Sequence, residues 1–317
     1  MHRTVNPVWC ILHKEQTIMK QKFTALILSL ILALSCAACG DTEAPVSSQP
    51  PAAETTLPSE PTAAPESYVF PETVLEDTEE LLFSITALED DPLWGYTMKA
   101  YLENRGSREL MFSLDLVSVN GFMCDPFWAA TVAPGMKANE EIRFLSTDFQ
   151  RNGITKPTEI RFTLRIYDAN DYTSGALLSK EFTVYPQGEE AVEDFIRTPV
   201  AGETVLFENE YAALIVTGTQ EDTVWGYGLN VYLENRTDKN LLFSAEDVSV
   251  NGFMCDPYWS TTVAPGMRSN TTISWFEETL ADNQITEVES IVMTISVSDG
   301  DNWMADPLFR ETFTVNP

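Results

Sequence analysis

Histidine and basic residues are scarce in this chain. Its 317 residues include two histidines, and 19 Lys and Arg stand against 48 Asp and Glu, for a formal net charge of −29. His2 and His13 both lie in a leader that we expect to be removed, so the mature chain has no histidine for Ser-His or Cys-His catalysis or for a metal site. The acidic excess repels phosphate backbones and argues against nucleic acid as a partner.

Long apolar runs are also scarce. The run FTALILSLILAL at 23–34 follows the positive stretch Met19-Lys20-Gln21-Lys22, an order typical of a secretory signal. A membrane-spanning helix needs about 20 apolar residues, so this run is short for a span. Residues 1–18 lack the signal pattern, which makes Met19 an alternative start. We expect residues 1–38 to form the signal peptide region.

The apolar run ends in LSCAACG at 34–40. This ending resembles the lipobox of bacterial lipoproteins, in which small residues precede a cysteine that is acylated and becomes the mature N-terminus. The resemblance implies a diacylglyceryl group on Cys39. Cys36 is the weaker alternative and stands where the family usually has Leu. Two acyl chains anchor a protein stably, so we expect the chain to be held on the extracytoplasmic face of the cell membrane.

A linker follows the predicted acylation site. Residues 39–71 are rich in Pro, Ala, Ser, Thr and Glu and contain no Lys or Arg. A segment of this composition buries too little apolar surface to order itself. Its prolines favour extended backbone at about 3.1 Å per residue, so the linker is predicted to be a tether between membrane and domains.

The rest of the chain is an internal duplication. Residues 72–186 and 203–317 align without a gap, with 48 identities in 115 positions, and 187–202 connect them. The phrase GFMCDPFWAATVAPGM at 121–136 returns almost unchanged at 252–267. A match of this length indicates two copies of one structural unit.

Apolar and polar residues alternate in each copy, as they do in half-buried β-strands. In residues 94–104, Trp94, Tyr96, Met98, Ala100 and Leu102 share one face, and Trp225, Tyr227, Leu229, Val231 and Leu233 repeat it. Residues 159–168 alternate in the same way. Further strands are expected near 79–88, 110–119, 122–132, 139–145 and 178–185. Seven or eight short strands per copy predict two tandem immunoglobulin-like antiparallel β-sandwiches, an all-β fold.

Two turn signals border the repeated phrase. Asn120-Gly121 predicts a hairpin turn and Pro134-Gly135 a type II turn, with one strand between them. Pro126 inside that strand predicts an edge or a bulge. The run VSVNGFMCDP, the later TVAPGM and the turn IYDANDY resemble uncharacterised immunoglobulin-like repeats in lipoproteins of gut Firmicutes. That resemblance implies fold and location and supplies no catalytic residues.

Several side chains are candidates for a site. Cys124 and Cys255, one per copy, are predicted to be buried free thiols. Trp128 and Trp259 are either core residues or an exposed platform for a ligand, because their neighbours Phe127 and Tyr258 point to the opposite face. Tyr172 and Trp303, each at the end of an acidic turn, are the best candidates for exposed aromatic side chains.

The acidic turns themselves offer oxygen atoms. Their spacing does not complete an EF-hand, and Asp, Asn and Gly also dominate plain turns, so calcium binding and an ordinary turn are both open. The candidate ligands are Asp168, Asn170 and Asp171 in the first copy and Asp299, Asp301 and Asn302 in the second.

The sequence favours a non-catalytic role. We expect a lipid-anchored binding or scaffolding module for a protein or a cell-wall glycan, without a required cofactor. Two alternatives remain: a glycan-active enzyme or accessory subunit that uses a carboxylate pair, and a structural spacer without a ligand.

Overall fold

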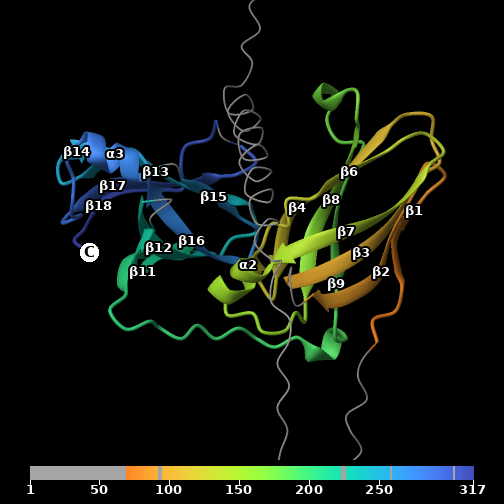
Figure 1. The fold of residues 1–317 in the computed structure, drawn as a ribbon, viewed down its shortest axis with the longest axis horizontal. Helices are drawn as coiled ribbons and strands as arrows, with labels where there is room; N and C mark the ends of the chain where they lie inside the picture. The colour runs from red at the N-terminus through yellow and green to blue at the C-terminus, as the bar shows by residue number, and fades with distance from the viewer. Residues whose placement is uncertain (1–68, 92–94, 223–225, 258, 303) are drawn as a thin grey trace, which may run out of the picture. The chain divides into compact units, whose positions relative to one another are not determined.

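The computed structural model describes residues 69–91, 95–222, 226–257, 259–302 and 304–317, which belong to one compact unit (Figure 1). The predicted signal region and the acylation candidates Cys36 and Cys39 lie outside the described residues. The same holds for the linker up to residue 68 and for Trp94, Trp225, Tyr258 and Trp303. No helix in the described ranges is long and apolar enough to cross a membrane.

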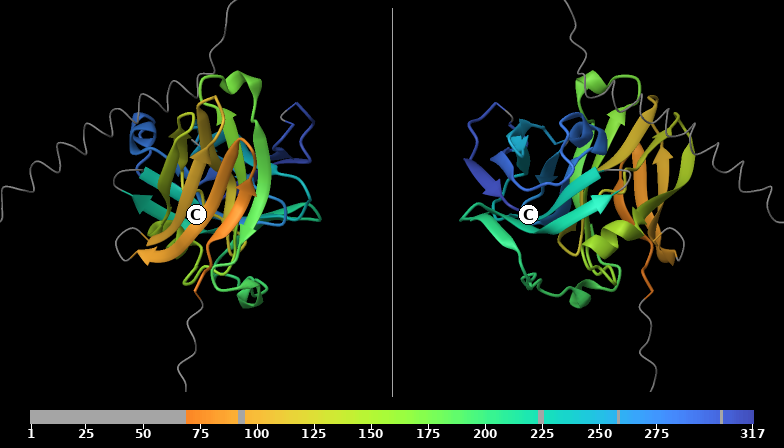
Figure 2. Two further views of the ribbon diagram at one scale, coloured as in Figure 1. Left: turned by 90° about the vertical axis from the view of Figure 1, so that its right-hand side faces the viewer. Right: turned by 60° about the vertical axis from the view of Figure 1, so that its left-hand side comes forward.

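The first repeat is a sandwich of two sheets. One sheet, seen face-on in the left view of Figure 2, has the order β1-β2-β3-β7, and the facing sheet contains β4, β8 and β9 with both β5 and β6 paired to β4. The bounds are β1 Thr73–Asp77, β2 Leu81–Asp91, β3 Gly95–Asn104, β4 Leu110–Val119, β5 Phe122–Met123, β6 Ala129–Val132, β7 Lys137–Leu145, α2 Ser146–Arg151, β8 Ile160–Asp168, η1 Tyr172–Ser174 and β9 Leu178–Val184.

The second repeat has the same strand order. Its sheets are β10-β11-β12-β16 and β14-β13-β17-β18, with β15 also paired to β13. The bounds are η2 Glu189–Ala191 in the connection, then β10 Thr204–Glu208, β11 Ala212–Asp222, β12 Gly226–Asn235, β13 Leu241–Val250, β14 Phe253–Met254, β15 Ser260–Val263, β16 Arg268–Trp275, α3 Glu277–Asp282, β17 Ile291–Asp299 and β18 Phe309–Val315. All pairing within a repeat is antiparallel, and two facing sheets in this order form an immunoglobulin-like sandwich, which confirms the predicted fold class.

The cores lie where the alternation placed them. In β3, Met98 and Leu102 are fully buried, and in β8 every second residue from Ile160 to Ile166 is buried. The second repeat buries Leu229, Val231 and Leu233 in the same way. Alternate residues of a strand point to one face, so each repeat fills the space between its two sheets with one apolar set.

The repeated phrase differs from the single strand expected at 122–132. It forms two short strands, β5 and β6, separated by residues 124–128. Phe127 takes a positive φ of 48°, and its amide donates to the Asp125 carboxylate at 2.7 Å. This local turn holds Pro126 outside any strand, where its missing N–H costs no ladder hydrogen bond.

The predicted turns are present, but several short elements were missed. The hairpin turn is confirmed, because Asn120 and Gly121 have φ of 50° and 79°, and Gly135 has φ of 71° in the predicted turn. The strands β1 and β10 and the one-turn helices α2 and α3 were not predicted, since segments of five or six residues carry little periodicity.

The two repeats share a sheet. β16 of the second repeat pairs in parallel with β5 of the first, through Arg268 and Phe122, and this contact joins two four-strand paths into a nine-stranded sheet. Figure 1 shows the connecting segment, in green, running along one side of both repeats.

Candidate functional site at the junction of the repeats

The junction is centred on Arg268. Its amide donates to the Gly121 carbonyl at 2.9 Å, a backbone hydrogen bond that links the two repeats. Gly121 has a φ of +79°, and a Cβ at this position would lie 3.0 Å from Arg268 Nη1. The positive φ favours glycine here, and the arginine side chain passes close to the position that a Cβ would take.

An aromatic pair covers the Arg268 side chain. The guanidinium lies 4.5 Å from the ring centroid of Phe195, and Phe195 meets Phe122 edge to face at 5.0 Å. Phe122 is only 5% exposed. The nearest acid is Glu234, whose Oε1 lies 3.7 Å from Arg268 Nε. Cation–π and edge-to-face contacts of this kind each stabilise by about 0.5–1.5 kcal/mol.

Further contacts connect the repeats on both sides of this centre. Arg161 donates to the Pro265 carbonyl at 2.8 Å, and the Asn270 side chain donates to Asn152 Oδ1 at 3.1 Å. Ile215 and Tyr232 of the second repeat belong to the apolar cluster of the first. Apolar and polar contacts together make the junction an interior surface.

The connecting segment is clamped to the second repeat. Arg197 pairs with Glu203 through two hydrogen bonds, at 3.0 and 2.5 Å, and lies 4.7 Å from the ring centroid of Tyr232. Arg197 and the Val200 amide together lower the pKa of the Glu203 carboxyl below its ordinary value. The clamp fixes the segment that precedes it, residues 191–196, over the junction.

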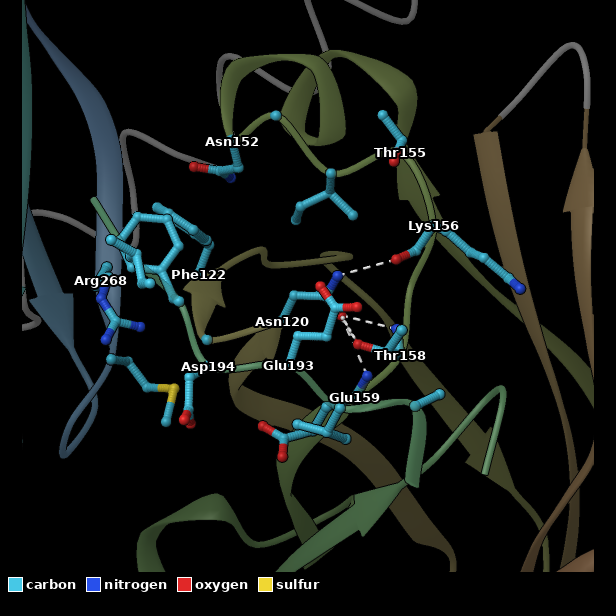
Figure 3. Close-up of a pocket in the computed structure, with 18 residues that line it drawn as sticks. Asn120, Phe122, Asn152, Thr155, Lys156, Thr158, Glu159, Glu193, Asp194 and Arg268 are labelled. Carbon is cyan, nitrogen blue, oxygen red and sulfur yellow. Dashed lines mark hydrogen bonds between the residues drawn. The ribbon is translucent and has the colours of Figure 1, made fainter. Parts of the chain in front are cut away.

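A groove of about 610 Å³ opens between these parts (Figure 3). Phe122 and Arg268 stand on one side of it in the figure, and Thr155 and Thr158 on the other. Its volume lies within the range of about 300–1,000 Å³ typical of ligand sites. The first repeat supplies Asn120–Phe122, 152–156 and 158–159, the connection supplies 191–196, and the second repeat supplies Met267 and Arg268.

Asn120 stabilises one wall of the groove. Its amide donates to the Lys156 carbonyl at 2.9 Å, and its Oδ1 accepts from the Thr158 and Glu159 amides at 2.8 and 3.1 Å (Figure 3). Asn251 makes the same set of bonds to Glu287, Glu289 and Ser290 in the second repeat. Because the second repeat makes the same bonds away from the junction, these bonds are structural.

The connecting segment supplies the exposed apolar side chains and the unpaired carboxylates of the groove. Val192, Phe195 and Ile196 are 40%, 39% and 85% exposed. Glu193 and Asp194 lie between them, and within the described residues neither carboxylate forms an ion pair. An exposed apolar strip next to unpaired carboxylates suits a ligand that is both apolar and cationic.

The predicted aromatic candidates lie elsewhere. Trp128 and Trp259 are each half-buried against the core of their own repeat, and neither lines the groove. Phe127 is the exposed member of its pair, at 86%. Tyr172 is 53% exposed, and its hydroxyl donates to the Met111 sulfur at 2.8 Å.

Both described cysteines are buried free thiols, as predicted. The Asn152 and Asn283 side chains each donate to the sulfur of their own repeat at 3.4 Å. Burial, together with the negative charge of Asp148, raises the pKa of Cys124 to about 12, and burial raises the pKa of Cys255. A thiol with a raised pKa is a weak nucleophile at neutral pH.

The acidic turns use their oxygens internally. Asp171 accepts from the Thr173 and Ser174 hydroxyls, and Asp168 accepts from the Asn170 amide at 3.0 Å. In the second copy, Asp299 pairs with Lys239 at 2.9 Å, and Asp301 accepts from the Asn240 side chain at the same distance. Across the described ranges, no cluster of three or more His, Cys, Asp or Glu side chains is arranged to hold a metal ion.

Comparison with known proteins yields little. No family model matches the chain, and no curated protein matches it. Among solved structures it is similar to the Salmonella enterica SafA pilin in complex with the SafB chaperone, with 12% identity and a TM-score of 0.21 over 76% of this chain and 99% of that chain. A likeness with so low a TM-score carries no argument about function.

The residues of the groove were not found by sequence reasoning. One sequence difference pointed to them: after the identical PGM of the repeated phrase, the first copy has Lys137 and the second has Arg268. A second was the run EDFI at 193–196, which is apolar and acidic in a connection that was expected to be plain linker.

Proposed function

We propose that this protein is a lipid-anchored, non-catalytic binding module of the cell surface, and that its ligand is a protein segment with basic and apolar side chains. The observation that carries the proposal is the exposed strip Val192–Ile196 beside Glu193 and Asp194, along a groove of about 610 Å³. The lipobox-like ending at Cys39 and the Pro-rich tether support the surface location.

The groove favours a protein partner over a glycan. Glycan sites commonly present a free aromatic face, and here Phe122 is buried and the Phe195 ring packs against both Phe122 and Arg268. Ile196 instead offers an aliphatic side chain that is 85% exposed. Covering such a side chain contributes about 1.5–3 kcal/mol, and nearby carboxylates add attraction for Lys and Arg.

Binding is tested with residues 40–317 and fluorescent decapeptides that differ in their Arg and Leu content. We expect saturable binding that needs both residue types and weakens with salt. Ile196→Ser should reduce the affinity by about 10-fold or more, and Glu193→Gln with Asp194→Asn should reduce the salt dependence. Glu190→Gln, an exposed neighbour outside the groove, is the matched control.

Other outcomes contradict the proposal. Co-sedimentation with cell-wall glycan and no peptide binding replaces the protein partner with a glycan. No binding to either leaves the spacer alternative, and cleavage of a polysaccharide leaves the enzyme alternative. The anchor is tested separately by palmitate labelling of the whole chain, where Cys39→Ser should lose the label and Cys36→Ser should keep it.

A further inference from the structure

The same residues have different environments in the two repeats. Phe122 is 5% exposed at the junction, whereas its equivalent Phe253 is 50% exposed. Met123 packs against the core of the second repeat, whereas Met254 is 66% exposed. The second repeat thus has an uncovered copy of the strand that forms the junction. This copy is β14, Phe253–Met254, and we call it the donor strand.

The other half of the junction also has an uncovered copy. Met267 is 8% exposed beside β5, whereas its equivalent Met136 is 56% exposed. β7, the equivalent of β16, is the edge strand of its sheet and begins at Lys137, which stands where β16 has Arg268. We call Met136–Lys137 the acceptor edge.

The acceptor edge keeps two of the side chains near Arg268, a glutamate and a tyrosine. Lys137 Nζ lies 3.5 Å from Glu103 and 6.0 Å from the ring centroid of Tyr101, and Glu103 and Tyr101 are the equivalents of Glu234 and Tyr232. The polar bridge is kept as well. Asn139 and Asn283 are the equivalents of Asn270 and Asn152, which meet across the junction at 3.1 Å.

We propose that the donor strand of one molecule pairs with the acceptor edge of a second copy of this chain. The contact repeats between molecules the joint that β5 and β16 make within one. The partner is a second copy because, in the first repeat, a surface of this same chain covers Phe122 and Met123. Since donor and acceptor are different surfaces, the contact is head-to-tail, and each added molecule leaves one of each free.

Three differences make the contact between molecules weaker than the joint within one. Asp247 replaces Leu116, which packs against the second core. Ser84, which is already buried in its own repeat, replaces Ile215, which packs into the apolar cluster of the first repeat. No connecting segment crosses the new contact. The formal charge of −29 makes molecules repel one another, so salt should strengthen association. Without a linker the contact lacks the millimolar effective concentration that a short tether supplies, so association should need high protein concentration.

The test is sedimentation of residues 40–317 at rising concentration. We expect the weight-average mass to rise at least about twofold toward ~1 mM, and to rise further in high salt. Phe253→Ser with Met254→Ser removes the donor strand, and Met136→Ser with Lys137→Glu removes the acceptor edge. Each variant alone should stay monomeric. Met304→Ser changes an exposed methionine elsewhere, at 77%, and is the control.

Mixing the two variants gives the decisive result. Each keeps one intact surface, so an equimolar mixture should form dimers and nothing larger. Unchanged thermal midpoints establish that both variants fold. The proposal is overturned by a constant monomer mass at the highest concentration and salt, by association that survives in both variants, or by a mixture that stays monomeric or grows beyond dimers.

Discussion

Phe122→Ala and Phe253→Ala test the junction with a control built into the chain. The two phenylalanines occupy equivalent positions in identical NGFM turns, and each begins a two-residue strand. They differ in what covers them. Phe122 contacts Phe195 and lies in the apolar cluster that also contains Tyr232, and Phe253 is half exposed. The difference between the two losses therefore isolates what the junction contributes.

The magnitude follows from the exposed fractions. Phe122 is 5% exposed and Phe253 50%, so on a side chain of roughly 200 Å² the junction covers roughly 90 Å² more. At about 25 cal/mol per Å² this is roughly 2 kcal/mol. The edge-to-face contact with Phe195 adds about 0.5–1.5 kcal/mol. Phe122→Ala should lower the free energy of unfolding by about 2.5–3.5 kcal/mol more than Phe253→Ala.

Urea unfolding followed by tryptophan fluorescence measures both losses. The parent chain should unfold in one transition, because the repeats share a sheet and an apolar cluster. Equal losses for the two variants would refute the reasoning, since they would mean that the covering surface adds nothing to Phe122. A parent chain that unfolds in two separate steps, with only one of them moved by Phe122→Ala, would refute it too.

Three further predictions rest on single groups. Asn104→Ala and Asn235→Ala should each lower the free energy of unfolding by about 2–3 kcal/mol, because the buried amide of Asn104 makes three hydrogen bonds and that of Asn235 makes four. The exposed Asn139→Ala should change it little in the same urea assay. Burial raises the pKa of Cys124 from 9.0 to about 12, so the thiol loses its proton at lower pH in the unfolded chain than in the folded one. Stability should therefore fall as pH rises above 9.0. Cys124→Ala should make the urea midpoint depend less on pH across the alkaline range. Glu203, whose pKa is lowered from 4.5, stabilises the fold above 4.5 and loses this effect as pH falls through the folded pKa, so Glu203→Gln should destabilise at neutral pH and make little difference in acid, as thermal midpoints would show.

The fold could be predicted because its strands are long and half-buried. Strands of nine or ten residues such as β3 and β8 show their inward face in the sequence, and the turns at Asn120-Gly121 and Pro134-Gly135 mark where they stop. The split of the repeated phrase could not be predicted in this way. It depends on a positive φ at Phe127, a conformation that phenylalanine does not favour and that the Asp125 carboxylate stabilises.

The candidate site could not be predicted because it depends on contact between distant segments. β5 has two residues, too few to show a period, and its partner β16 lies more than a hundred positions later in the chain. The phrase is identical at Phe122 and Phe253, so nothing in the letters says which copy is covered. The candidate platform residues Trp128 and Trp259 occur at the same position in both repeats, and each packs against the core of its own repeat.

Native-state hydrogen exchange at two amides tests the central claim most directly. The Arg268 amide donates across the junction to Gly121, whereas the equivalent Lys137 amide lies at the start of an edge strand. At a dilution where molecules do not associate, Arg268 should exchange far more slowly than Lys137, because its exchange requires the repeats to separate. Equal, fast exchange at both positions would show that the junction does not persist, and the groove and the donor and acceptor surfaces would lose their basis.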